Sequence, residues 1–333
     1  MYLPNKKNNY LKLIIDQFNE NNIKTSISPE IINLIILPTE KCNFRCIYCY
    51  ENFDIGKMKD ETIQGIKKFL YSKFYNLEYI HISWFGGEPL LAQEVISDIS
   101  RFILENQPKY NFKYTSAITT NGYLLEKSVF LDLLKFKIND YQISLDGTEE
   151  IHNQTRVLSN GDGTFSKIWN NLLDMRSVPD DFQVTFRIHL TKNNSANILK
   201  LIKNIESSFE NDFRFKIFLK EIGNYNPSKI IDTLSSDKAI KIKKEILNII
   251  GENRKVPLLK NYICYASKKN SFIIRANGNI SKCTIALYDE KNTIGKLNAD
   301  GTMELDNEKY KKWTKGLQTK DAKYMKCPLK FIN

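Results

Sequence analysis

Three cysteines lie within eight residues near the start of the chain and could together hold a metal or an iron–sulfur cluster. Cys42, Cys46 and Cys49 are separated by three and then two residues, and they follow an apolar run. Thiolates are the usual ligands of iron in iron–sulfur clusters, and three of them would leave one iron of a [4Fe–4S] cluster open to another ligand. A zinc site and a redox dithiol are the alternatives. Zinc commonly takes four ligands, however, and the histidines of the chain are scattered.

The spacing resembles the CxxxCxxC signature of the radical S-adenosylmethionine (SAM) family, in which an aromatic residue, here Tyr48, precedes the third cysteine. The resemblance implies that Cys42, Cys46 and Cys49 hold a [4Fe–4S] cluster, and that its open iron binds the amino and carboxylate groups of SAM. It further implies reductive cleavage of SAM to a 5′-deoxyadenosyl radical that removes hydrogen from a substrate. The electron would come from a donor such as flavodoxin or ferredoxin.

Two glycine-containing motifs follow the second and third strand-like runs. The run 86–89, Gly-Gly-Glu-Pro, resembles the family's GGEP motif, which implies that Glu88, alongside Gly87, binds the ammonium group of SAM. A carboxylate at a strand end is suited to accept hydrogen bonds from an ammonium group, although an ordinary tight turn would have the same sequence. Thr119 and Asn121 belong to a Thr-Asn-Gly stretch that often lines the SAM side in the family, and a strand-to-helix turn is the alternative.

A third motif, Ser-Leu-Asp-Gly at 144–147 followed by His152 and Arg156, resembles a block of the SPASM-type branch of the family. By that resemblance Ser144 and Arg156 hold the carboxylate or ribose of SAM, and the planar guanidinium of arginine is suited to pair with a carboxylate. We expect His152 to be a structural hydrogen-bonding residue. Asp146 is expected either to cap the next segment or to orient Arg156.

These motifs need elements that bring strand ends together, and six strand-like runs alternate with six segments of helical apolar spacing. Parallel neighbouring strands require such crossovers, so the alternation predicts an α/β fold that forms an open or closed barrel. The family that the motifs resemble has a partial (β/α)6 TIM-like barrel. In such a barrel we expect the functional residues at the C-terminal ends of the strands. The predicted strands are 31–38, 79–85, 113–119, 140–145, 183–190 and 214–220; the predicted helices are 61–74, 92–105, 125–135, 164–175, 195–207 and 237–250, after a lead-in helix over 9–21.

Beyond about residue 253 the alternation stops, and short strand-like pieces with turn signals predict a small second domain. We therefore expect three parts: a lead-in over 1–30, a radical SAM barrel over 31–252 and a truncated SPASM or Twitch-like domain over 253–333. Strands are expected in the last part over 271–276, 279–283 and 298–303.

Cys264, Cys283 and Cys327 fall in this last part, and the first two flank Gly278 in a pattern that resembles the opening CX9–15GX4C element of SPASM and Twitch domains. Those domains carry auxiliary [4Fe–4S] clusters, so the resemblance implies a second cluster held by these three cysteines. The full SPASM cysteine set is not present, because the further cysteines expected around Cys327 are missing. A vestigial site, a cluster with an open iron and three unrelated buried cysteines are the alternatives.

The composition of the chain indicates which classes of partner to expect. The 333 residues carry 49 Lys and Arg against 38 Asp and Glu, which gives a net charge of +11. The lysines are spread along the chain, so we expect no nucleic-acid partner, and the basic balance suits a weakly acidic peptide. No apolar run approaches the roughly 18 residues of a membrane span, so we expect no membrane partner and a reducing, cytoplasmic location in which thiolates survive.

The resemblance favours a radical SAM enzyme that modifies a peptide or protein substrate, for example by a thioether or carbon–carbon cross-link in a ribosomally made peptide. Oxidation of a protein Cys or Ser, as in anaerobic sulfatase maturation, is an alternative that is weaker because those enzymes carry the complete auxiliary cysteine set. A non-catalytic iron–sulfur protein for electron transfer or peptide binding is a further alternative. The presence of Glu88, Ser144 and Arg156 argues against it.

Overall fold

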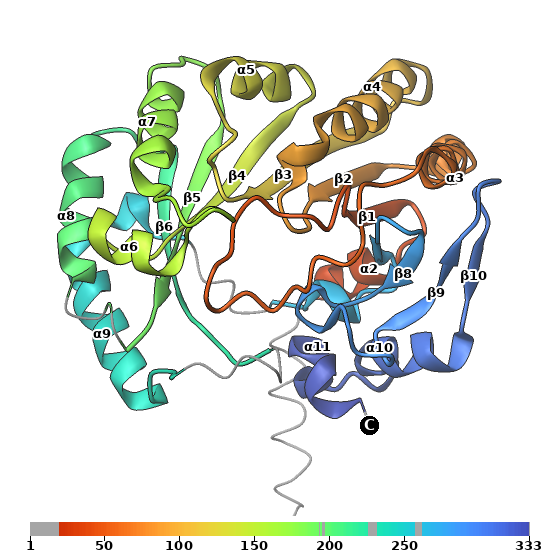
Figure 1. Cartoon of the computed structure of the whole chain (residues 1–333). Helices are drawn as coiled ribbons and strands as arrows, with labels where there is room; N and C mark the ends of the chain where they lie inside the picture. The colour runs from red at the N-terminus through yellow and green to blue at the C-terminus, as the bar shows by residue number, and fades with distance from the viewer. Residues whose placement is uncertain (1–19, 193, 195–196, 226–231, 257–261, 333) are drawn as a thin grey trace, which may run out of the picture.

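Six parallel strands form the centre of the computed structural model, which describes residues 20–192, 194, 197–225, 232–256 and 262–332. The strands follow one another in chain order, and helices lie outside the arc that they form (Figure 1). This arrangement confirms the predicted α/β fold with a parallel, partial barrel. The strands are β1 (Ile31–Ile36), β2 (Tyr79–Trp84), β3 (Lys113–Thr120), β4 (Ile138–Leu145), β5 (Gln183–Leu190) and β6 (Phe215–Glu221). The helices are α2 (Glu20–Ile27), α3 (Asp60–Tyr71), α4 (Gln93–Tyr110), α5 (Lys127–Lys135), α6 (Glu149–Thr155), α7 (Phe165–Arg176), α8 (Ile198–Ser208) and α9 (Ser236–Ile249).

Apolar periodicity explains why these elements form. In α8 the buried residues Ile198, Leu201, Ile202 and Ile205 recur at helical spacing, so one stripe of the helix packs on the sheet. Burying one such side chain contributes about 1.5–3 kcal/mol. The strands bury alternate side chains on the side that faces these helices. Every second side chain therefore points into the interior of the arc, and the strict alternation of burial in β2 is an example.

The C-terminal region extends the same sheet. Strand β7 (Ser271–Ile274) pairs in parallel with β1, and β8 (Asn279–Ser281), β9 (Thr293–Leu297) and β10 (Met303–Leu305) continue it as antiparallel neighbours. The result is one ten-stranded sheet in the order β10-β9-β8-β7-β1-β2-β3-β4-β5-β6. Helices α10 (Asn307–Thr319) and α11 (Ala322–Lys326) follow. The division into three parts stays a prediction, and the sheet runs across the expected boundary between the last two.

Two local predictions need correction. Strands occur within 271–276 and 279–283, but the predicted strand over 298–303 is wrong because β9 ends at Leu297 and the next residues turn, with Gly301 at φ +90° donating its N–H to the carbonyl of Asn298. Helix α6 was not expected because its seven residues are too few to show a periodicity. The predicted lead-in helix over 9–21 lies almost wholly outside the described residues, as do 195–196 at the start of another predicted helix.

No helix within the described ranges is long and apolar enough to cross a bilayer.

Candidate active site

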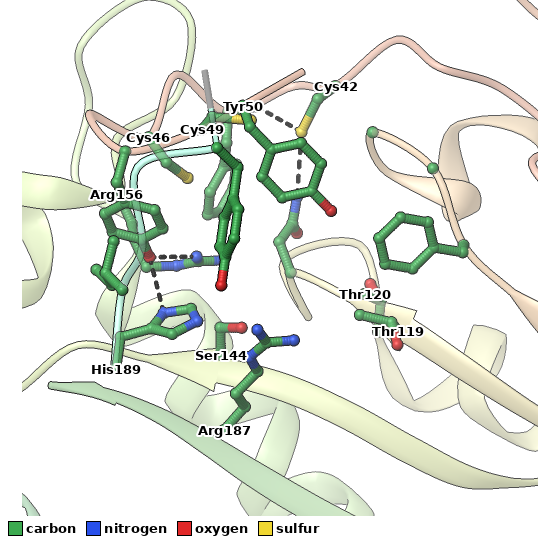
Figure 2. Close-up of a pocket in the computed structure, with 18 of the residues that line it drawn as sticks. Cys42, Cys46, Cys49, Tyr50, Thr119, Thr120, Ser144, Arg156, Arg187 and His189 are labelled. Atoms are coloured by element: carbon green, nitrogen blue, oxygen red, sulfur yellow. Dashed lines mark hydrogen bonds between the residues drawn. The ribbon is translucent and has the colours of Figure 1, made fainter. Parts of the chain in front are cut away.

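The sequence motifs meet at a cavity at the C-terminal ends of the parallel strands (Figure 2). The loop after β1 supplies the three cysteines, and the ends of β2, β3 and β4 supply the other motifs. The cavity is therefore built as the barrel prediction requires, from the strand ends that face the same side. The predicted residues that line it are Cys42, Cys46, Tyr48, Cys49, Gly87, Thr119, Asn121, Ser144 and Arg156.

Backbone hydrogen bonds hold the cysteine loop (residues 40–50) against the end of α6 and the segment that follows it. The amide of Arg45 donates to the carbonyl of Val157 at 2.8 Å, and the amide of Ile47 donates to that of Thr155 at 3.0 Å. At the start of the loop, Glu40 is fully buried and forms a bidentate ion pair with Arg275, at 3.1 and 2.5 Å. These contacts fix the loop at both sides of the cavity.

The glycines after β2 let the strand end approach this loop. A Cβ atom at Gly86, whose φ is +126°, would lie 2.2 Å from the carbonyl oxygen of Thr39, and one at Gly87 would lie 2.4 Å from that of Lys41. The amide of Glu88 donates to the same Lys41 carbonyl at 2.9 Å. Glycine is thus required here for the close packing of two protein segments, while the backbone of Gly87 still lines the cavity.

The Glu88 carboxylate does not face the cavity, so its predicted role needs correction. The side chain is fully buried and accepts hydrogen bonds from the amide of Leu90 at 3.0 Å, the hydroxyl of Thr120 at 2.7 Å and the amide of Asn121 at 2.7 Å. Burial raises the pKa of Glu88, and these three donors oppose the rise. The carboxylate joins the ends of β2 and β3, and it is absent from the described residues that line the cavity.

Asn121 and Thr119 differ in what they offer a ligand. The side-chain amide of Asn121 donates to the side-chain oxygen of Asn43 at 2.8 Å and accepts from the amide of Tyr123 at 2.9 Å, so it ties the cysteine loop to the end of β3. Thr119 points into the cavity, and within the described residues its hydroxyl has only one long contact, with the side-chain amide of Gln142, which donates to it at 3.4 Å. Their predicted contacts with SAM stay predictions.

A buried polar network lies at the cavity wall that β4 and β5 provide, and it consists of Tyr48, Arg156, Asp146 and His189. The Tyr48 hydroxyl accepts from Arg156 at 2.8 Å and donates to Asp146 at 3.0 Å, and His189 Nδ1 lies 3.0 Å from the same carboxylate. Although burial works in the opposite direction, the hydrogen bond and charge of His189 and the charge of Arg156 hold the pKa of Asp146 well below its ordinary value. Asp146 therefore orients Arg156 through Tyr48. Capping of the next segment, the other expectation for Asp146, is not observed at α6.

His152 is structural, as expected. Both ring nitrogens have partners, the amide of Asp146 at 3.4 Å and the hydroxyl of Thr164 at 3.1 Å. Burial lowers the pKa of His152 to about 3. The Asn153 side chain accepts from the amides of Thr164 and Phe165, at 2.9 and 3.1 Å, and so caps α7. The hydroxyl of Thr164, the residue before α7, donates to the carbonyl of Arg156.

The three C-terminal cysteines come together although 43 residues separate the last two. The amide of Cys264 donates to the carbonyl of Met325 at 2.9 Å, which places it beside the end of α11, where Cys327 follows. The amide of Thr284, next to Cys283, donates to the hydroxyl of Tyr265 at 3.0 Å. The charges of Cys264 and Cys327 contribute to the raised pKa of Cys283, about 11, in which burial is the largest cause.

The residues present fit an iron–sulfur cluster and SAM in the main cavity. Burial raises the pKa of the Cys42 thiol, so its thiolate form needs a cation such as iron beside it. Arg156 is buried, and its Nε atom has no hydrogen-bond partner among the described residues. Within those residues, no three His, Cys, Asp or Glu side chains are arranged to hold a single metal ion. Fold and site together define a class: α/β-barrel enzymes that use SAM with an iron–sulfur cluster.

The chain belongs to the Radical SAM superfamily, whose family model matches residues 36–205. It is 27% identical over 298 residues to a cysteine-type anaerobic sulfatase-maturating enzyme of Clostridium novyi, with 78% of this chain and 75% of the relative covered. SAM and a [4Fe–4S] cluster are therefore its cofactors.

Two solved structures share the fold. One is anSMEcpe with bound AdoMet and Cp18Cys peptide, with a TM-score of 0.66 at 20% identity, covering 85% of this chain and 83% of the other. The second is Streptococcus suis SuiB bound to the precursor peptide SuiA, with a TM-score of 0.63 at 17% identity, covering 95% of this chain and 73% of the other. Their similarity extends beyond the barrel to most of this chain.

Sequence reasoning missed part of the cavity wall. Some of the missed residues lie beside motif residues, but Arg187 and His189 of β5 have no motif around them. They reach the cavity because alternate side chains of that strand point inward. That alternation, applied to β5, is the signal that could have found Arg187 and His189. The missed lining residues are Phe44, Tyr50, Phe53, Phe85, Gly86, Thr120, Arg187, His189, Glu221, Ile222, Gly223 and Tyr225.

Proposed function

We propose that this radical SAM enzyme modifies a peptide that enters the cavity on the side of Tyr50 and Tyr225. The observation that carries the proposal is a continuous cavity whose wall runs from the cysteine loop to these two tyrosines, which contact each other edge to face at 6.1 Å. Tyr50 is close enough to Tyr265 for their charges to interact, so this wall approaches the C-terminal cysteines. A peptide there would lie between the two groups of cysteines.

The chain's own residues would hold SAM next to the cysteine loop. Ser144 and Arg156 line the cavity on the β4 side, where a hydroxyl and a guanidinium can bind the carboxylate. Tyr48 and the ring of Phe44, 5.6 Å from the guanidinium, keep Arg156 in place. Because the Glu88 carboxylate is engaged elsewhere, we assign the ammonium group to backbone carbonyl groups near Gly87.

When bound, the cluster and SAM supply a 5′-deoxyadenosyl radical that takes a hydrogen atom from the peptide, with one electron from a donor of the flavodoxin or ferredoxin class. The chain's part is to keep the peptide hydrogen close to SAM and to exclude water. The aromatic residues Phe53, Phe85 and Tyr225 support this role because they give the cavity an apolar wall.

Cys264, Cys283 and Cys327 are proposed to hold an auxiliary cluster. Their convergence supports this, and so does Lys282, whose ammonium group is buried and whose charge interacts with Cys264. A buried cation offsets part of the negative charge of thiolate ligands. The proposal is independent of the barrel site, so a failure here would leave the SAM chemistry intact.

The names of related proteins support a peptide or protein substrate. SuiB is described with its precursor peptide, which favours ribosomal peptide maturation with a thioether or carbon–carbon cross-link. The relationship to a sulfatase-maturating enzyme favours a second candidate, oxidation of a Cys or Ser in a protein. The two differ chemically, because conversion of a Cys to an aldehyde loses its sulfur whereas a thioether cross-link keeps it.

The test uses full-length protein, reconstituted with iron and sulfide without oxygen and then reduced. We expect deoxyadenosine from SAM, and mass spectrometry of cysteine-containing peptides incubated with the protein should show loss of hydrogen with retention of sulfur. Loss of sulfur instead would favour the sulfatase-maturing candidate. Absence of deoxyadenosine above a cluster-free control would contradict the enzyme itself.

A further inference from the structure

Arg187 and Lys220 are inward-facing cations to which the proposed SAM site assigns no role. Arg187 is in β5 and pairs across the sheet with Ser144 of β4, so its side chain lies on the cavity face beside Ser144 (Figure 2). Lys220 is in β6 and pairs with His189, which also lines the cavity. Paired residues of neighbouring parallel strands point to the same face. The two cations therefore occupy one face of the barrel interior, and we call them the cationic pair.

Neither member of the cationic pair forms an ion pair within the described part of the chain. The Nε atom of Arg187 is buried without a hydrogen bond. Two carboxylates of this region form ion pairs with other residues: Asp146 binds His189 at 3.0 Å, and Glu221, whose charge also acts on Lys220, binds Lys243 at 2.7 Å. Burial and the charge of Arg187 lower the pKa of Lys220, so the two side chains lie close enough to repel each other. Two like charges in a half-buried site are costly unless an anion joins them.

SAM does not supply that anion. It brings one carboxylate, but also an ammonium and a sulfonium, so it adds no net negative charge. Its carboxylate is already assigned to Arg156, whose guanidinium is anchored by Tyr48 on the side of the cavity near Cys46. The guanidinium of Arg187 extends separately from β5, beside Ser144 (Figure 2).

The cationic pair also lies where the proposed substrate would be. The charge of Arg187 acts on Tyr50, and the charge of Cys327 acts on Lys220. The pair thus spans the interval between the cavity and the C-terminal cysteines. We propose that Arg187 and Lys220 bind a carboxylate of the peptide substrate, either an Asp or Glu side chain or the C-terminal carboxylate. This inference rests on the proposed function and specifies which peptides the cavity accepts.

The test measures which peptides the reconstituted, SAM-bound protein retains. The probes are two pools of short acetylated peptides with randomised central positions, one pool amidated at the C-terminus and the other with a free acid. Retained peptides are identified by mass spectrometry. We expect enrichment of Asp and Glu in the amidated pool if a side chain is bound, and enrichment of the free-acid pool irrespective of Asp and Glu content if the C-terminus is bound.

Substitution separates the role of Arg187 from that of a structural residue. Arg187→Gln should reduce the retention of carboxylate-bearing peptides by roughly tenfold or more, the value of a charge-assisted hydrogen bond, and should reduce SAM affinity far less. Lys220→Gln should act in the same direction, and Arg187→Lys should restore part of the retention. Arg101→Gln, at an exposed position of α4, is the matched control and should change neither measurement.

Each contrary result has a distinct meaning. Retention of peptides irrespective of their charge would overturn this inference but leave the proposed function intact. Unchanged enrichment of acidic peptides by the Arg187→Gln variant would do the same. A loss of SAM affinity in Arg187→Gln that equals or exceeds the loss of peptide retention would assign Arg187 to SAM binding. This result would also overturn the inference. A protein that cleaves SAM but retains no peptide would overturn the proposed peptide function, and the inference with it.

Discussion

The two groups of cysteines are built in opposite ways. Cys42, Cys46 and Cys49 stand on one loop, and backbone hydrogen bonds such as that from Ile47 to Thr155 hold this loop in place. The C-terminal cysteines come from three segments that meet only because the fold brings η4 (Tyr265–Ser267), the end of β8 and the end of α11 together. The first group can be recognised from spacing, whereas the second depends on tertiary structure.

Their electrostatic surroundings differ as well. The first group faces Arg156, which stays available to a ligand through its Nε atom, because this atom has no hydrogen-bond partner in the described part of the chain. The second lies beside Lys282, whose ammonium group is already bound to the carbonyls of Lys268 and Ser271, both at 2.6 Å. We therefore expect the barrel cysteines to form a site that binds a ligand, and the C-terminal cysteines to form a closed site with a structural or electron-transfer role. The following predictions test this contrast, beginning with the largest effect.

The largest effect is expected when the first group is removed. The triple variant Cys42→Ala, Cys46→Ala and Cys49→Ala should lose all SAM cleavage, and its iron content should fall from about eight to about four atoms per chain. Iron analysis and chromatography of deoxyadenosine measure both. The matched control, Ala at Cys264, Cys283 and Cys327, should show the same fall in iron but keep SAM cleavage. No iron at all in the first variant would contradict the auxiliary cluster.

The next effect concerns the ion pair that links the two regions. Arg275 follows β7, and its guanidinium and the carboxylate of Glu40 are both buried. Arg275→Met should lower the free energy of unfolding by about 3–5 kcal/mol, because it leaves a buried carboxylate unpaired. Lys57→Met removes the exposed pair with Glu94 and should cost below about 1 kcal/mol. Similar denaturation midpoints for the two variants would show that the link between the regions is unimportant.

A smaller effect is expected at the ligand-facing arginine. Arg156→Ala should weaken SAM binding by roughly 10- to 150-fold, the equivalent of about 1.5–3 kcal/mol for a charge-assisted hydrogen bond, and should leave the iron content unchanged. Titration calorimetry with SAM measures it. Tyr48→Phe removes only the hydroxyl that orients the guanidinium and should have a smaller effect. An unaltered SAM affinity in Arg156→Ala would make this residue purely structural.

The smallest effect is a pH dependence of stability at His152. The pKa of this residue is about 3 in the folded chain and about 6.5 when unfolded, so the unfolded state binds the proton first and stability falls as pH decreases below about 6.5. At pH 5 the loss should be about 2 kcal/mol, from roughly 1.5 pH units at about 1.4 kcal/mol each. Denaturant unfolding at pH 7 and pH 5 measures it, and His152→Gln should remove this part of the slope.

The sequence predicted the barrel and the positions of most lining residues because strand ends and motifs coincide. It did not predict where side chains point. Glu88 has a side chain of a type that can bind ligands. Three hydrogen-bond donors at the strand ends, however, occupy its carboxylate. Arg187 has no motif, yet the register with Ser144 brings it to the cavity. The turn after Leu297 was predicted to be a strand. Short strands in a hairpin show too few alternations of polar and apolar residues to be distinguished from the turns between them.

The pairing of β7 with β1 has a consequence for folding. Strand β1 is synthesised well before its second neighbour, β7, which begins at Ser271. Until then one side of β1 presents unpaired N–H and C=O groups, which are a template for association with other chains. Contacts between residues so distant in sequence also form slowly. Partly synthesised or truncated chains that end before β7 should therefore aggregate, and closure of the sheet by the C-terminal region should limit the rate at which soluble protein accumulates.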